Sequence, residues 1–114
     1  MTLKDFADII GQMKIPARYN HWDATKELPP DPYIEYAETY TENFGADDQV
    51  YQGVQHIDLF LFTRTKNRAA EQEVERVLNS NKIFWDKTET YLEDEKVYQI
   101  LYEVSIWLTR SDSD

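Results

Sequence analysis

The side chains best suited to acid–base or metal chemistry are the two histidines, His21 and His56, each followed two positions later by an aspartate. If the segment around His56 is a strand, His56 and Asp58 point to the same side, which a metal site would require. Such a site needs further ligands that the sequence does not nominate. We therefore interpret both histidines as surface or hydrogen-bonded structural residues, and we expect no metal site.

Carboxylates are abundant, and 22 acidic residues in a short chain will form close pairs by chance. We interpret Glu93, Asp94 and Glu95 as a solvated turn, and Asp47 with Asp48 as a loop, because the alternating oxygen ligands of a calcium loop are absent. The chain has no Cys, only 3 Gly and no nucleophile-elbow motif. These features predict a protein without enzymatic activity or cofactor.

Composition indicates one small domain. The 114 residues are 41% hydrophobic and 14% aromatic, enough for a single core, so we expect one domain over residues 1–110 and a polar tail over 111–114. A formal charge of −10 repels phosphate backbones and disfavours nucleic-acid binding. The lack of Cys fits a reducing compartment such as the cytoplasm, and no segment is apolar enough to predict a membrane span.

Helical periodicity predicts two helices. The first runs from Leu3 to Lys14, with Thr2 and Asp5 as a capping pair and Pro16 as the stop. Asn67 is expected to cap the second. The apolar stripes are Leu3, Phe6, Ala7, Ile10 and Met13 in the first helix, and Ala70, Val74, Val77 and Leu78 in the second, whose Glu71, Glu73, Glu75 and Arg76 are expected to face water.

Alternating apolar residues predict five strands. The segment 50–65 is apolar on both sides at Phe60 and Phe62, which predicts a strand covered on both faces, with Gly53 as a bulge or bend. Residues 41–48 are expected to form a turn or exposed loop. The other strands are a short one over 15–20, then 33–40, 83–91 and, most clearly, 98–108, with the turn 93–95 before the last.

The resulting order is α-β-β-β-α-β-β, with a hairpin on each side of the second helix. Hairpins favour antiparallel pairing, so the predicted class is α+β with a mostly antiparallel sheet of about five strands and two helices.

Aromatic residues surround the acidic segment near residue 47, which is typical of protein interfaces. Equally, some of these rings can pack in the domain's own core, since opposite faces of a strand differ. The candidate interface residues are Tyr36, Tyr40, Asn43, Phe44, Asp47, Asp48 and Tyr51.

Several short motifs follow one another in an order that resembles a known family. A Pro-Tyr strand opening precedes the loop Asn43-Phe44-x-Ala46-Asp47, which leads to Val50-Tyr51. A Leu-Phe-Thr strand end then enters a Glu-rich helix, and a Lys-x-Glu-x-Tyr strand is followed by Glu95-Lys96-x-Tyr98. Over roughly residues 32–106 this pattern resembles the tail-completion, minor capsid and head-tail joining proteins of tailed bacteriophages and prophages of Gram-positive bacteria.

The resemblance implies a tail terminator in the virion neck. Such a subunit forms a ring with copies of itself, typically a hexamer, caps the tail tube and meets the head connector or stopper protein. DNA would pass through the channel without specific binding. Two alternatives stay open: a head-completion stopper or adaptor in the same setting, and an acidic DNA mimic that inhibits a host nuclease.

Overall fold

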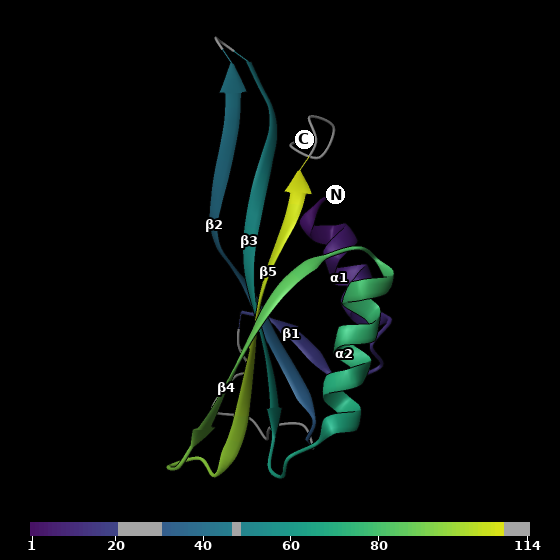
Figure 1. Cartoon of the computed structure of the whole chain (residues 1–114), viewed down its shortest axis with the longest axis vertical. Helices are drawn as coiled ribbons and strands as arrows, with labels where there is room; N and C mark the ends of the chain where they lie inside the picture. Colours follow the sequence, from purple (N-terminus) through teal and green to yellow (C-terminus); the bar gives the residue numbers. More distant parts are fainter. Residues whose placement is uncertain (21–30, 47–48, 109–114) are drawn as a thin grey trace.

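The computed structural model of the chain describes residues 1–20, 31–46 and 49–108, of which 43–46, 49–52 and Leu108 are described by backbone alone. It confirms the predicted class and element order (Figure 1). The elements are helix α1 (Leu3–Gly11), strands β1 (Ala17–Tyr19), β2 (Tyr33–Ala46) and β3 (Gln49–Thr63), helix α2 (Arg68–Ser80), and strands β4 (Phe84–Leu92) and β5 (Val97–Leu108).

The strands form one sheet in the order β1-β2-β3-β5-β4. β2 with β3, β3 with β5, and β5 with β4 are antiparallel, whereas the short β1 runs parallel to β2. The two hairpins predicted on either side of α2 are therefore present. β5, the strand with the strictest alternation of apolar residues, lies between β3 and β4.

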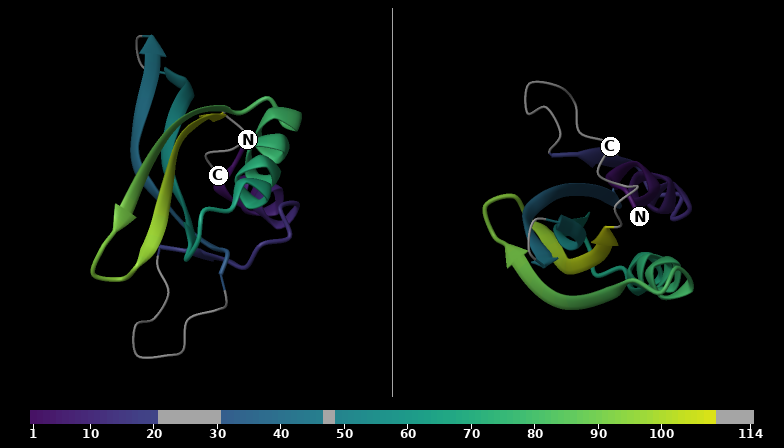
Figure 2. Two further views of the ribbon diagram at one scale, coloured as in Figure 1. Left: turned by 60° about the horizontal axis from the view of Figure 1, so that its bottom comes forward. Right: turned by 90° about the horizontal axis from the view of Figure 1, so that it is seen from above.

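Both helices lie on one face of the sheet (Figure 2). Phe6 of α1 and Val74 of α2 are fully buried, and both belong to a single core with Tyr102 and Leu59 of the sheet. Each such side chain contributes roughly 1.5–3 kcal/mol through burial of apolar surface. The opposite sheet face is not covered by any helix or strand in the described ranges, and we call it the open face.

Helix α1 begins as predicted. The Thr2 hydroxyl accepts a hydrogen bond from the Asp5 N–H, and the Asp5 carboxylate accepts one from the Thr2 N–H, which completes a capping box. The helix ends at Gly11, however, and not at Lys14, whose φ of 58° is left-handed and incompatible with a further helical turn. Met13 is still buried because the following turn directs it into the core.

Two predictions about the central strands are wrong. Residues 41–46 continue β2 instead of forming a turn, because pairing with β3, for example Glu42 with Val54, overrides their polar composition. Phe60 and Phe62 lie on the open face and are only partly buried, so β3 is not covered on both sides. Phe62 stacks on the Tyr33 ring, with centroids 5.1 Å apart.

The irregularities of the β2–β3 pair do not lie at Gly53, which pairs in register with Asn43 on one side and Leu108 on the other. One register shift passes over Thr39 on β2, and the other passes over Tyr51 on β3. Bulges at these two positions bend and twist the hairpin without breaking it.

Candidate functional site

The β2–β3 hairpin continues beyond the rest of the sheet. The last residue of β3 that pairs with β5 is Gly53, opposite Leu108. Past this point, among the described residues, β2 and β3 pair only with each other, up to Ala46 and Gln49. We call residues 43–53 the arm; Figure 1 shows it projecting past the end of β5. The 14 residues of β2 span about 48 Å at about 3.4 Å each, close to the 50 Å long axis of the molecule.

Three of the seven predicted interface residues have a described backbone position in the arm. Asn43 and Phe44 lie on its β2 strand, and Tyr51 lies at its β3 bulge. Asp47 and Asp48 fall outside the described residues. A two-stranded ribbon with no third strand is only marginally stable in water, so an arm of this length is suited to making contacts with another molecule.

Of the three tyrosines predicted at the interface, the structure describes the side chains of two, Tyr36 and Tyr40, and these lie in different environments. Tyr36 is buried and makes edge contacts with the rings of Phe6 and Tyr19, at centroid distances of 6.0 and 5.5 Å, so it packs in the chain's own core. Tyr40 is 57% exposed on the open face and stacks on the His56 ring at 4.1 Å. Of the two, only Tyr40 is available to a partner.

Side chains of three strands form a polar network around His56, as Glu42, His56 and Ser105 come from β2, β3 and β5. His56 Nε2 donates to the Glu42 carboxylate at 2.6 Å, and the Ser105 hydroxyl lies 3.2 Å from Nδ1. Because a carboxylate only accepts, Nε2 carries the proton of the contact with Glu42, and Nδ1 accepts from the Ser105 hydroxyl in the tautomer that leaves Nδ1 without a proton. His21, the other predicted histidine, lies outside the described residues.

Serine, histidine and glutamate in this order are also the components of a hydrolase triad. A nucleophilic serine requires free backbone N–H groups that form an oxyanion hole, usually at a sharp turn. Ser105 instead lies inside a regular ladder, opposite His56 on one side and Phe84 on the other. We therefore interpret the network as a cross-strand contact that fixes the register of β2, β3 and β5. That the chain has no catalytic activity stays a prediction.

Beside this network, three carboxylates cross the open face in one row. Asp58, Glu103 and Asp86 are direct cross-strand neighbours on β3, β5 and β4. Like charges in such positions repel one another. Burial raises the pKa of Asp58 above its ordinary value.

His56 and Asp58 lie on the same side of β3, as their spacing predicted, and line one hollow of about 320 Å³. Within the described ranges no three acidic or histidine side chains converge closely enough to hold a metal ion.

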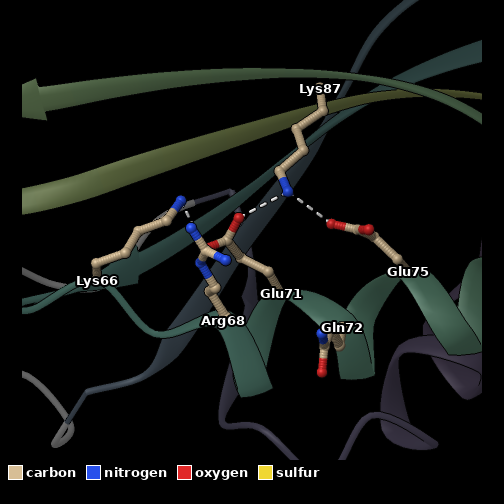
Figure 3. Close-up of a pocket in the computed structure, with 6 residues that line it drawn as sticks. All are labelled: Lys66, Arg68, Glu71, Gln72, Glu75 and Lys87. Atoms are coloured by element: carbon tan, nitrogen blue, oxygen red, sulfur yellow. Dashed lines mark hydrogen bonds and ion pairs between the residues drawn. The ribbon is translucent and has the colours of Figure 1, made fainter.

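A second charged cluster lies between α2 and β4 (Figure 3). It includes Glu71 and Glu75, which the helical pattern predicted to face water. The prediction that Glu71 faces water is wrong, since its side chain is only 6% exposed. Lys66 lies 2.8 Å and Lys87 2.6 Å from its two carboxylate oxygens. Lys87 also contacts Glu75 at 2.8 Å, and the Tyr102 hydroxyl donates to the same Glu75 oxygen at 2.8 Å.

These contacts set the protonation of the cluster. Burial by itself would raise the pKa of Glu71, but hydrogen bonds from Lys66 and Lys87 outweigh it and hold the pKa below its ordinary value of 4.5. Burial raises the pKa of Tyr102, and its hydrogen bond to Glu75 raises it further. The adjoining hollow measures about 330 Å³. Because both ammonium groups are already paired with carboxylates, we interpret this cluster as structural.

The pH dependence of stability tests this interpretation. Because the pKa of Glu71 is lowered by folding, its contribution is present above pH 4.5 and is lost as the pH falls through the folded pKa. Between these values the wild type should lose stability more steeply than Glu71→Gln, by at most about 1.4 kcal/mol per pH unit. Urea unfolding over that range measures the difference. Glu93→Gln, in the exposed turn, should behave like the wild type, and equal slopes for all three proteins would contradict the interpretation.

No family model matches the chain, and no curated protein matches it in sequence. Neither helix in the described part of the chain combines the length and the apolar character needed to cross a membrane.

Proposed function

We propose that the chain is a structural protein of a bacteriophage virion: a tail terminator or tail-completion subunit that forms a ring, caps the tail tube and joins it to the head connector. The observation that carries the proposal is the arm, a two-stranded extension that no third strand of the described residues covers. The motif order over residues 32–106 supplies the phage setting, since it resembles proteins of the head-tail junction.

The surface chemistry supports assembly. Large aromatic side chains stand exposed on the open face, namely Phe84 at 70%, Trp107 at 61% and Tyr40 at 57%. Aromatic residues are enriched in protein interfaces because they bury a large area with few rotatable bonds. In a ring of identical copies, each copy contacts one neighbour through one surface patch and the other neighbour through a second patch. Such a ring would cover these aromatic surfaces in every copy.

The charge supports a channel that DNA crosses without binding. Six copies of a chain with a formal charge of −10 would carry about −60, so most carboxylates must face water or the channel. An acidic wall repels the phosphate backbone and lets DNA slide past. The ring would assemble in the host cytoplasm and remain in the neck of the virion.

Electron microscopy of particles made without this protein tests the proposal. Tails of abnormal length are the expected result, because a terminator stops polymerisation of the tail tube. Full heads beside complete but unjoined tails of normal length would favour the head-completion stopper instead. Normal virions would overturn both assignments.

A further inference from the structure

Strand β4 is an edge strand without a bulge or a proline, two of the usual protections. It is nine residues long and pairs with β5 in unbroken register from Phe84 to Leu92. No other strand in the described ranges pairs with its outer side. Natural edge strands are shielded by bulges, prolines or outward lysines. β4 has no bulge and no proline, and its one lysine, Lys87, is turned toward α2, where it pairs with Glu71 and Glu75.

The composition of β4 favours pairing. Its sequence FWDKTETYL is rich in aromatic and β-branched residues, which favour strands. Thr88 and Thr90 are exposed in the middle of the strand, and Phe84 and Tyr91 are exposed near its ends, at 70% and 46%. Such an edge is a template for an added strand, because its outward N–H and C=O groups lack strand partners.

A second open edge lies at the opposite end of the same sheet. β1 pairs only with residues Ile34 to Tyr36 of β2. From Ala37 to Ala46, β2 has β3 on one side and no strand of the described ranges on the other. As far as the described residues show, each copy of the chain therefore offers two different open edges, and the arm forms part of one of them.

We propose that the outer edge of β4 in one copy pairs through backbone hydrogen bonds with the outer edge of β2, residues 37–46, in the next copy. The sheet then continues from subunit to subunit. Because the two edges differ, the contact is head-to-tail, and such a contact closes into a ring when its rotation divides a full circle. The inference rests on the ring proposed above and identifies the surfaces that join its subunits.

A charge placed on the edge tests the role of β4. Thr88→Lys/Thr90→Lys adds outward lysines to an exposed strand, the device by which natural edges avoid pairing. We expect this variant to stay monomeric at concentrations where the wild type forms rings, while its unfolding midpoint is unchanged. Gln72→Lys/Ser80→Lys adds the same charge on the exposed side of α2 and should form rings like the wild type.

Disulfide mapping tests which edge is the partner. The chain contains no cysteine, so every thiol is an introduced one. Glu42 and Thr88 both lie on the open face, but β3 and β5 separate their strands. A separation of about 14 Å, three strand spacings, is too long for a disulfide within one chain, whose Cα atoms must approach within about 7 Å.

The Glu42→Cys protein is therefore mixed, in separate experiments, with the Asp86→Cys, Thr88→Cys or Thr90→Cys protein. These three positions on β4 cover the possible registers of its pairing with β2. The expected result is a covalent heterodimer with at least one of the three, and none with Ser80→Cys. Rings that form without any of these cross-links, or rings of the double-lysine variant, would overturn the edge pairing but leave the ring itself standing. Cross-linked copies that do not bind tail tubes would instead contradict the proposed function.

Discussion

Replacing residues 43–53 by Asn-Gly is expected to leave the chain folded but unable to form rings. Glu42 and Val54 are paired residues, so a two-residue turn can close the shortened hairpin directly. The fold should persist because the core residues that the structure describes all lie outside the arm. Ring formation should fall below detection, because the removed segment includes five of the seven predicted interface residues by sequence position, together with the outer part of the β2 edge. Mass photometry at increasing protein concentration measures the loss.

A second loop provides the matched control. Replacing residues 93–96 by Asn-Gly also shortens a hairpin, between the paired residues Leu92 and Val97. Both replacements remove two more acidic than basic residues, so the change in charge is the same. The control should assemble like the wild type. If the arm variant also forms rings of normal size, the arm is not an assembly element.

The charged cluster under α2 gives the largest expected effect on stability. Lys66→Met/Lys87→Met leaves the Glu71 carboxylate, 6% exposed, without its two cations. A buried charge that loses its partners costs about 3–5 kcal/mol. We expect the lower end, because Arg68 lines the same hollow and can approach Glu71 (Figure 3). Equilibrium urea unfolding at pH 7 measures the change.

Two further variants separate charge pairing from other effects of the mutations. Adding Glu71→Met to the double variant removes the unpaired charge, and most of the lost stability should return, since a buried ion pair can often be replaced by apolar side chains. Lys4→Met/Lys82→Met removes the same charge at two exposed positions and should change stability by less than about 0.5 kcal/mol. A loss that Glu71→Met does not recover would refute the role assigned to the cluster.

The sequence predicted those features of the fold that arise from local patterns. The capping box at Thr2, the buried stripe of α2 and the alternation through Tyr102 all reflect contacts that recur at fixed spacing along the chain. Such spacing is set by the geometry of a single helix or strand. It was therefore sufficient for the element order and the class.

Features that depend on pairing between distant segments were missed. Residues 41–46 have the composition of a turn, and only their register with β3 makes them a strand. Glu71 precedes Val74 by three positions, so the two side chains share one face of the helix, and this spacing is a signal that Glu71 is buried. The ion-pair partner of Glu71, however, is Lys87, which belongs to a strand beyond the end of α2. The acidic row of Asp58, Glu103 and Asp86 likewise exists only because three strands align.

The candidate interface rests partly on the sequence and partly on the fold, and its contact with a partner stays a prediction. Composition indicated the aromatic and acidic segment near residue 47, and the fold places that segment in and around the arm. The open edge of β4 had no such signal, because a strand's sequence does not reveal whether one or two neighbours pair with it. The exclusion of Tyr36 from the surface also required the fold, since its ring packs against Phe6 of α1.

The central claim is that identical copies of this chain assemble through strand edges and the arm on the end of a tail tube. Electron microscopy of purified protein mixed with purified tail tubes tests it most directly. The account predicts one ring at one end of each tube, visible in averaged images. A protein that stays strictly monomeric beside bare tube ends would contradict it.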